Sequence, residues 1–256
     1  MDMSGNTILI TGGGTGIGRG LAEAFHASGN SVIVAGRRPE PLAEVVATNP
    51  GMASAVVDVA DRDGIRAFSE RLLHDHPALN VLINNAGMMA IEDVLAEAID
   101  LSACEATIAI NLLGPIRLTA ALLPHLRRRP AATVVNVTSG LAFVPRADTP
   151  TYGATKAAMH SYSQSLRFLL RDSSVQVIEL APPLVATDLT PGQRSNPRAM
   201  PLDEYIRESM ALFATDGSAP EILVERVKLQ RNAEARGEGR GARGDYAKVF
   251  AMINDG

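Results

Sequence analysis

Cysteine and long apolar runs are scarce in this sequence. Its single cysteine, Cys104, cannot form a disulfide within the chain, which fits a reducing compartment. No apolar run reaches the roughly 18 residues that suggest a membrane span. The N-terminal stretch MDMSGNTILITGGG lacks the basic region of a signal peptide. We therefore expect a soluble, cytoplasmic protein without a membrane partner.

Positive charge is also limited. The 256 residues carry 24 basic and 28 acidic side chains, and the net charge of −4 gives no electrostatic support for a nucleic-acid partner. Only three of the basic residues are lysines, and one of them, Lys156, follows Tyr152 by four positions. Residues four apart lie on one face of a helix, so this spacing brings an ammonium close to a phenol.

Short runs rich in β-branched residues alternate with longer helical patterns along most of the chain. This alternation predicts βαβ units and a parallel sheet. Because the strand runs are apolar throughout, helices should cover both faces of the sheet. We therefore expect one α/β domain over residues 1–256, built on a doubly wound parallel sheet. Strands are expected at 7–11, 31–35, 53–59, 80–84, 132–138 and 174–180, and helices at 16–28, 39–47, 62–75, 99–128 and 151–171.

The pattern changes after Pro182. Residues 187–201 are rich in proline, glycine and polar groups, whereas 203–214 and 218–234 have helical patterns. The segment 235–245 is rich in glycine and charge, and we expect it to be mobile.

A glycine-rich turn, TGGGTGIG at residues 11–18, follows the first strand and opens a helix. Such a turn lets backbone N–H groups approach a pyrophosphate at the positive end of the helix. The alternative is a tight turn with a structural role only. The turn predicts a nucleotide site that includes Gly12, Gly14, Thr15, Gly16, Ile17 and Gly18.

The end of the second strand bears on the choice of nucleotide. An acidic residue there holds the adenosine ribose hydroxyls, whereas a basic residue suits a 2′-phosphate. Gly36 occupies the acidic position, and Arg37 and Arg38 follow it. This favours NADP(H), although NAD(H) stays possible. The alternative is that both arginines are simply solvated at a helix start.

Two further strand ends carry candidate cofactor contacts. Asp58 and Val59 end the third strand, where a carboxylate could accept from the adenine amino group; Asp61 is the better candidate for capping the next helix. The fourth strand ends in NNAG at 84–87, at the sheet edge where such folds bind ligands. From this tetrapeptide we expect a structural role for Asn84 and cofactor contacts from Asn85, Ala86 and Gly87.

The tyrosine and lysine form the candidate catalytic pair. A tyrosine has an unperturbed pKa of about 10, and a nearby ammonium such as that of Lys156 lowers this pKa and makes Tyr152 a better acid–base group. Ser139 ends the fifth strand, where its hydroxyl could bind the oxygen of a reacting carbonyl. Asn111 is a polar residue among apolar ones in the long helix, where it could hold a water that links Lys156 to solvent.

Together these motifs make the sequence similar to the short-chain dehydrogenase/reductase family, of classical type. The similarity covers residues 5 to about 190. It implies a Rossmann-like seven-stranded sheet, a nicotinamide cofactor and a catalytic tetrad of Asn111, Ser139, Tyr152 and Lys156. Tyr152 would exchange a proton with the substrate oxygen, Ser139 would position that oxygen, Lys156 would also bind the nicotinamide ribose, and Asn111 would anchor a relay water.

The sequence departs from the family pattern at two places. The usual Pro-Gly pair after the sixth strand is Pro182-Pro183, although Pro182, Val185 and Thr187 still match cofactor contacts. The usual C-terminal strand motif is absent, and the tail at 235–256 is atypical. This tail and the APP motif resemble the DltE-like subgroup. In many relatives the C-terminal strand builds a tetramer interface, so we favour a homodimer through helices 99–128 and 151–171 over a tetramer.

Several expectations concern the substrate. Segment 141–150 lies between Ser139 and Tyr152, so its apolar residues Leu141, Phe143 and Val144 should line the pocket. Met88 is either core or the pocket floor. Segment 187–215 should lie over the cofactor as a lid. We expect no metal site, since the histidines of HDH at 74–76 suit an exposed helix end.

These observations favour an NADP(H)-dependent carbonyl reductase or alcohol dehydrogenase acting on a small apolar ketone or aldehyde. The alternative is a non-enzymatic sensor or scaffold that binds the same cofactor. A sensor needs no acid–base groups, yet all four tetrad positions are filled. An isomerase or dehydratase that reuses the site is a narrower third possibility.

Overall fold

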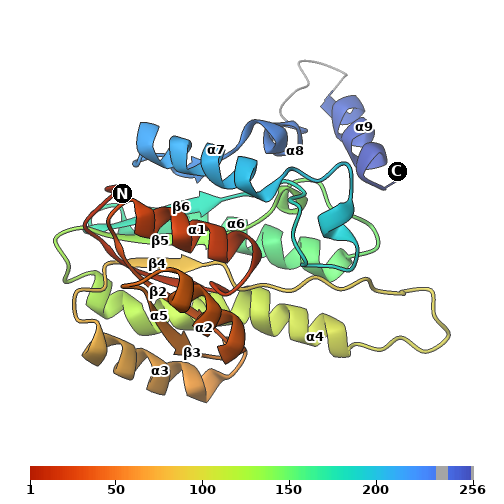
Figure 1. The fold of residues 1–256 in the computed structure, drawn as a ribbon. Coiled ribbons are helices and arrows are strands. Elements are labelled where there is room, and N and C mark those ends of the chain that lie inside the picture. Colours follow the sequence, from red (N-terminus) through yellow and green to blue (C-terminus); the bar gives the residue numbers. More distant parts are fainter. Residues whose placement is uncertain (235–241, 255–256) are drawn as a thin grey trace.

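The structure is a computed structural model that describes residues 1–234 and 242–254 (Figure 1). Seven parallel strands form one sheet in the order β3-β2-β1-β4-β5-β6-β7. Residues 235–241, part of the segment expected to be mobile, lie outside the described residues. The strands are β1 (Thr7–Thr11), β2 (Ser31–Gly36), β3 (Ala53–Val56), β4 (Val81–Asn84), β5 (Ala132–Val137), β6 (Val175–Leu180) and β7 (Glu221–Ile222).

Helices cover both faces of this sheet, as the apolar strands predict. One face packs against α1, α2 and α7 through residues such as Phe25, Val45 and Phe213. The other face packs against α3, α5 and α6 through residues such as Phe68 and Leu118. The predicted fold class, a doubly wound Rossmann-like sheet, is therefore confirmed. The helices are α1 (Gly16–Ala27), α2 (Pro39–Thr48), α3 (Arg62–Asp75), α4 (Ser102–Ile108), α5 (Gly114–Leu126), α6 (Pro150–Leu170), α7 (Leu202–Thr215), α8 (Lys228–Arg231) and α9 (Ala242–Asn254).

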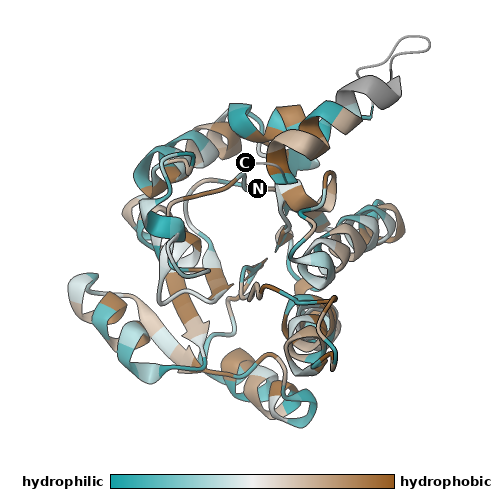
Figure 2. Ribbon diagram, turned by 90° about the vertical axis from the view of Figure 1, so that its right-hand side faces the viewer, coloured by the Kyte–Doolittle hydropathy of each residue, from teal (hydrophilic) through white to brown (hydrophobic). Residues whose placement is uncertain are grey.

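The strand order creates the place where a ligand can bind. From β1 the chain builds outward to β2 and β3, and then crosses to the other side of β1 to form β4. The loops after β1 and β4 therefore diverge at the carboxyl edge of the sheet and leave a crevice between them. Figure 2 shows the hydrophobic strands inside the ring of helices.

The expected long helix at 99–128 consists of α4 and α5 joined by a π-helical turn, Ala109–Leu113, that contains Asn111. By length and composition, Ser102–Leu126 could cross a membrane. Leu118, Leu122 and Leu126 are instead fully buried against the sheet and α3. This apolar stretch is therefore accounted for as a core helix.

Two sequence expectations about secondary structure are wrong. Strand β3 ends at Val56, so Asp58 and Val59 lie in the following loop. Residues 218–234 are not one helix: they contain β7, a 3-10 turn at Glu225–Val227 and the short helix α8. Strand β7 forms because Ile222 is buried and pairs with Leu180 of β6, a tertiary effect that no local pattern reveals.

The predicted lid at 187–215 combines two different structures. Residues 202–215 form α7, whose Tyr205 and Phe213 are buried and whose Phe213 ring packs edge-on against Phe25 of α1, with centroids 5.7 Å apart. This half belongs to the core, and its expected lid role is wrong. The remaining part, 187–199, is a loop whose two ends meet where Val185 and Met200 form a parallel bridge.

Candidate active site

A cleft of about 480 Å³ opens at the carboxyl ends of the strands. It brings together residues from segments that are far apart in the sequence. All of the predicted cofactor-binding residues line it: Gly12, Gly14, Thr15, Gly16, Ile17, Gly18, Arg37, Arg38, Asp58, Val59, Asn85, Ala86, Gly87, Tyr152, Lys156, Pro182, Val185 and Thr187.

The glycine-rich turn is shaped for a ligand that approaches the backbone. Gly12 has a φ of +66°, and a Cβ on Gly18 would lie 2.3 Å from the Gly12 carbonyl oxygen, so a side chain is excluded there. Thr15 precedes α1 without capping it through its side chain. The N-terminal N–H groups of α1 therefore face the cleft without a side-chain acceptor, as a phosphate site requires.

Asn85 supports this turn. Its side-chain Nδ2 donates to the Thr11 carbonyl oxygen at 2.9 Å, and its backbone N–H donates to the Thr11 hydroxyl at 3.0 Å. These bonds fasten the loop after β4 to the turn after β1. The neighbouring Asn84 is buried and donates to Asn136 at 2.9 Å, as expected for a structural residue.

The end of β2 offers positive charge without partners. Arg37 and Arg38 line the cleft, are exposed, and form no hydrogen bond or ion pair with any described residue. A side chain at Gly36 would meet only Leu42, at 3.8 Å, so this position is open space. Both guanidiniums are thus free to bind an anion beside the turn.

The two aspartates before α3 have separate roles. Asp61 caps α3 by accepting from the backbone N–H groups of Asp63 and Gly64, both at 3.1 Å, as predicted. Asp58 accepts from the Ala60 N–H at 2.9 Å and lines the cleft.

Three members of the predicted tetrad meet in the cleft. Ser139, Tyr152 and Lys156 all line it, and all three are buried. The Ser139 side chain lies close enough to the Tyr152 phenol for an interaction between them to affect the pKa of the phenol, and the Lys156 ammonium lies 5.6 Å from the centre of the Tyr152 ring. The Lys156 Nζ donates to the Val137 carbonyl oxygen at 2.8 Å. Two of its three donors are therefore available for other acceptors.

The expectation that Lys156 lowers the pKa of Tyr152 is wrong for this form of the protein. Burial raises the pKa of Tyr152 to about 12, against a lowering effect of the interaction with Ser139. Burial also lowers the pKa of Lys156 to about 8. Both side chains are buried where they line the cleft, and desolvation disfavours the charged form of each. The phenol is therefore a protonated acid near neutral pH.

Asn111 lies behind these residues. Its side-chain Oδ1 accepts from the Met88 N–H at 2.9 Å, and its Nδ2 donates to the Met88 carbonyl oxygen at 2.8 Å. A Cβ on Gly87 would lie 3.4 Å from Asn111 Oδ1 and 3.7 Å from Lys156 Nζ. Asn111 therefore holds the loop after β4 against the catalytic pair; its role with a relay water stays a prediction.

The expected pocket wall is partly wrong. Phe143 packs into the core, and Val144 is fully buried under Val249 of α9. Arg146 forms an ion pair with Asp148. Met88 was expected either in the core or on the pocket floor. It does both, because it lines the cleft and also packs against the core.

The sequence analysis missed several residues that line the cleft, three of them in the 187–199 loop. Pro183, Asp188, Leu189 and Gln193 line the cleft. Gln193 also donates to the Val185 carbonyl oxygen at 2.8 Å and to the Thr187 hydroxyl at 3.1 Å, which fixes the loop beside the predicted cofactor contacts. Pro183 belongs to the APP motif, but no motif marks Asp188, Leu189 or Gln193, so only the folded chain identifies these three residues.

Comparisons with known proteins identify the family of this chain. The short chain dehydrogenase family matches residues 6–198. An uncharacterized oxidoreductase, DltE, from Bacillus subtilis is 41% identical over 99% of this chain and 98% of its own. Sulfoacetaldehyde reductase 2 from Chromohalobacter salexigens is 32% identical over 82% of this chain and 84% of its own.

Solved structures extend the comparison. A short chain dehydrogenase from Burkholderia cenocepacia, in complex with NADP, has a TM-score of 0.80 and 25% identity, with 99% of both chains covered. One from Burkholderia phymatum, in complex with NAD, has a TM-score of 0.78 and 21% identity, over 93% of this chain and 97% of that one. The chain therefore belongs to the short-chain dehydrogenase/reductase family, as a DltE-like member.

Proposed function

We propose that this protein is an NADP(H)-dependent oxidoreductase, a single catalytic domain that interconverts a carbonyl and a secondary or primary alcohol. The observation that carries the proposal is the convergence of Ser139, Tyr152 and Lys156 in one cleft with the glycine-rich turn. A sensor or scaffold would need the turn but not a buried phenol beside a buried ammonium. Their burial costs free energy, so the pair is better explained by chemistry.

The residues of the cleft have separate roles in the proposed reaction. The nicotinamide, when bound, supplies or accepts the hydride. Tyr152, protonated at neutral pH, donates its proton to the carbonyl oxygen during reduction and takes it back in oxidation. Ser139 orients the same oxygen through its hydroxyl. Lys156 has spare donors for ribose hydroxyls, and Asn111 holds the Met88 loop in place.

Two arginines favour NADP(H) over NAD(H). Solved relatives contain either cofactor, so the family alone does not decide the preference. Arg37 and Arg38 have no partners among the described residues, and no carboxylate takes the position of Gly36. A 2′-phosphate would receive charge-assisted hydrogen bonds there, which NAD lacks.

We propose a small, uncharged, apolar ketone or aldehyde as the substrate. Among the described residues that line the cleft, the positive charges are Arg37, Arg38 and Lys156, all assigned to the cofactor or to catalysis. The apolar lining of the cleft includes Met88, Pro183 and Leu189. A sulfonate, the kind of group named for one relative, would find no further cation among these residues.

The direct test follows nicotinamide absorbance with NADPH and NADH over a panel of aryl ketones, ketoesters, aldehydes and sulfoacetaldehyde. We expect consumption of NADPH with neutral carbonyls and a smaller rate with NADH. Tight NADPH binding without turnover of any panel member would favour the sensor alternative. Preferred turnover of sulfoacetaldehyde would contradict the assigned substrate class.

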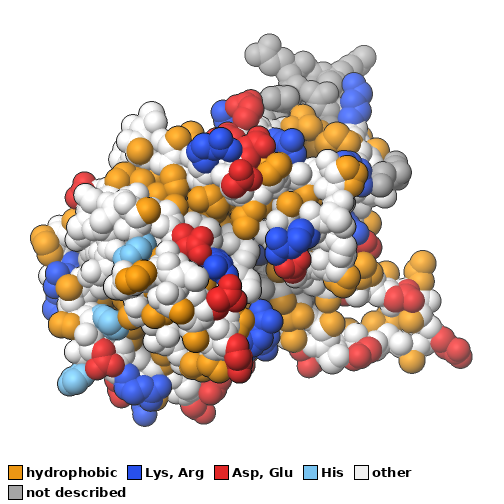
Figure 3. Space-filling view, viewed as in Figure 1, with side chains coloured by type: hydrophobic (Ala, Val, Ile, Leu, Met, Phe, Trp, Pro, Cys, Tyr) orange, Lys and Arg blue, Asp and Glu red, His pale blue; other side chains and the backbone are white. Residues whose placement is uncertain are grey.

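We also place the protein in the cytoplasm as a homodimer, through the face formed by α4, α5 and α6. Apolar side chains are exposed along this face: Leu113 lies at its middle, Phe168 is 66% exposed at one end, and Leu95 is 92% exposed on the arm 89–101 at the other. The arm carries four acidic and no basic residues, and it extends away from the body (Figures 1 and 3). Arg171 stacks on Phe168 at 4.1 Å.

A twofold axis near Leu113 would bring the acidic arm 89–101 of one copy close to the other copy's Phe168 end, which carries Arg171. We expect light scattering to give twice the 27.0 kDa mass of the chain, and Leu113→Arg to give the monomer. Thr48→Arg, on the outer surface of α2, is the matched control and should remain dimeric. A tetramer, or a dimer unaffected by Leu113→Arg, would contradict this interface.

A further inference from the structure

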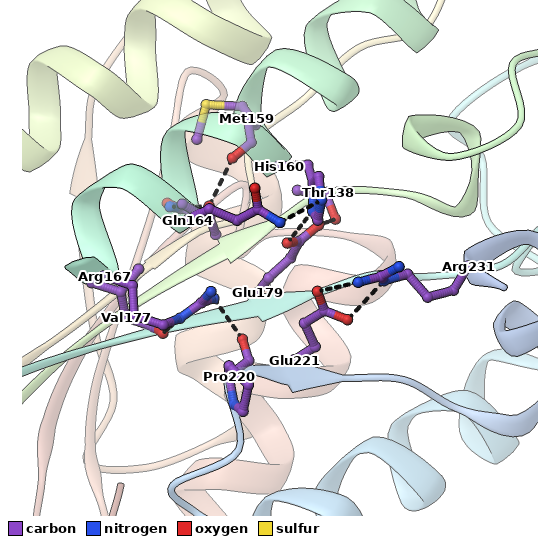
Figure 4. Close-up of polar contacts among 12 residues, drawn as sticks. Thr138, Met159, His160, Gln164, Arg167, Val177, Glu179, Pro220, Glu221 and Arg231 are labelled. Carbon is purple, nitrogen blue, oxygen red and sulfur yellow. Dashed lines mark hydrogen bonds and ion pairs between the residues drawn. The ribbon is translucent and has the colours of Figure 1, made fainter. Parts of the chain in front are cut away.

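A buried carboxylate lies on β6, the strand next to the edge strand β7, and is not among the residues assigned to the reaction. Glu179 of β6 is completely buried. Its Oε1 accepts from the Thr138 hydroxyl at 2.6 Å, and its Oε2 lies 2.7 Å from Nδ1 of His160 (Figure 4). A buried charge is costly even when it is hydrogen-bonded, and an apolar residue would fit a sheet core at lower cost. The position of these two partners suggests what the carboxylate does.

The partners of Glu179 belong to the two segments that carry the catalytic groups. Thr138 immediately precedes Ser139 at the end of β5. His160 lies on α6, one turn after Lys156 and two turns after Tyr152, on the same face of the helix. Glu179 therefore connects the segment that carries Ser139 to the helix that carries Tyr152 and Lys156.

A second connection joins the same two segments, but it uses a catalytic group. The Lys156 ammonium donates to the Val137 carbonyl oxygen, two residues before Ser139. Any partner that draws Lys156 into the cleft weakens this bond. The bonds from Thr138 and His160 to Glu179 do not involve the reacting groups, so they can hold α6 against β5 throughout the reaction.

The surrounding charges argue against a metal-ion role for this cluster. Ligand atoms of His160, Glu179 and Glu221 lie within 4.8 Å of one another. However, Arg231 makes two bonds to Glu221, at 2.8 and 3.0 Å, and so supplies the cation itself. Both oxygens of Glu179 are also engaged. The Gln164 side-chain nitrogen lies 3.0 Å from Nε2 of His160, so that the imidazole is held on both sides.

We infer that Glu179 is a positioning residue, which sets the distance between Ser139 and Tyr152 through Thr138 and His160. The inference rests on the proposed function of those two residues. Displacement of about 1 Å between reacting groups can cost 100-fold in rate. Loss of one acceptor at Glu179 is therefore expected to affect turnover more than cofactor binding, because most of the predicted cofactor contacts come from other segments that line the cleft.

The test compares two isosteric substitutions in neighbouring strands. Glu179→Gln removes one of two acceptors and should lower kcat about 10- to 100-fold, with the Kd for NADPH within about twofold of wild type. Glu221→Gln is the matched control: it weakens the pair with Arg231, which joins β7 to α8, whereas the Glu221 side chain makes no hydrogen bond to β5 or α6 among the described residues. It should lower Tm while leaving kcat within about twofold.

Substitutions at His160 give a second, independent comparison. His160→Asn can place an amide N–H where Nδ1 lies and should retain most of the turnover, whereas His160→Leu should behave like Glu179→Gln. This pair decides the question if Glu179→Gln does not fold. Equal loss of kcat in both His160 variants would overturn the inference.

A spectroscopic readout separates this inference from the proposed function. The four tyrosines can be labelled with ¹³C at Cζ, and Tyr152→Phe assigns the Tyr152 signal. Glu179→Gln should shift that signal, because the interaction between Tyr152 and Ser139 changes, and Glu221→Gln should not. If the Tyr152 signal shifts in Glu179→Gln but the wild-type protein reduces no carbonyl, the proposed function is refuted and the coupling of Glu179 to Tyr152 is supported. An unchanged Tyr152 signal in folded Glu179→Gln would overturn the coupling.

Discussion

Replacing Tyr152 with phenylalanine is expected to lower kcat for carbonyl reduction by about 10³- to 10⁴-fold, the upper range of general acid catalysis. The substitution removes only the hydroxyl that donates the proton. The ring stays in its buried position beside Lys156, so the Kd for NADPH should change by less than about threefold, since a ring of the same shape keeps its packing. Steady-state turnover and fluorescence titration of NADPH measure the two quantities separately.

The matched control for this substitution is Tyr162→Phe. Tyr162 lies on the same helix and is half-buried, but it does not line the cleft. Its loss should leave kcat within about twofold, as for surface substitutions away from a site. Retention of more than a tenth of wild-type kcat by Tyr152→Phe would show that another group donates the proton.

The pH profile of the wild-type enzyme tests the same assignment. With a Tyr152 pKa raised to about 12, the phenol is protonated across the neutral range, so reduction should not depend on its titration there. The pKa of Lys156 is lowered to about 8, so the ammonium loses its proton as pH rises through 8, and reduction should then decline. Oxidation of the alcohol needs the phenolate as a base and should rise with pH.

Replacing Arg37 and Arg38 together with alanine is expected to lower kcat/KM for NADPH by about 100-fold, the loss of two partly screened charge-assisted hydrogen bonds. The value for NADH should stay within about threefold, because NADH has no 2′-phosphate for these residues to bind. The preference for NADPH should therefore disappear, or reverse if Gly36→Asp is added to hold the ribose hydroxyls. Initial rates with NADPH and with NADH measure this preference.

Arg66→Ala is the matched control for this pair. Arg66 is an exposed arginine of α3 with one long contact, 4.0 Å, to Glu70, and it does not line the cleft. Arg66→Ala should change kcat/KM for neither NADPH nor NADH. An equal loss of activity with both cofactors in the double variant would assign the arginines a structural role, and a wild-type preference for NADH would contradict the reading of this strand end.

Local patterns predicted those features whose cause is local. Helix α3 was expected at 62–75 and spans Arg62–Asp75, because Asp61 caps it and its apolar residues repeat with the period of a helix. The glycine-rich turn was recognisable because Gly12 adopts a positive φ that other residues avoid. By contrast, β7 is two residues long and exists only because β6 offers it an edge.

The site itself divides in the same way. The sequence alone determined the fold class and the glycine-rich turn, and it predicted the arginines after β2 and the four candidate tetrad residues, because motifs and their spacing along strands and helices carry that information. Only the tertiary structure decided the burial that shifts the pKa values of Tyr152 and Lys156, the packing of Phe143 and Val144 outside the cleft lining, and the contact of Glu179 with Thr138 and His160. These depend on desolvation and on contacts between segments distant in the chain, which no local pattern encodes.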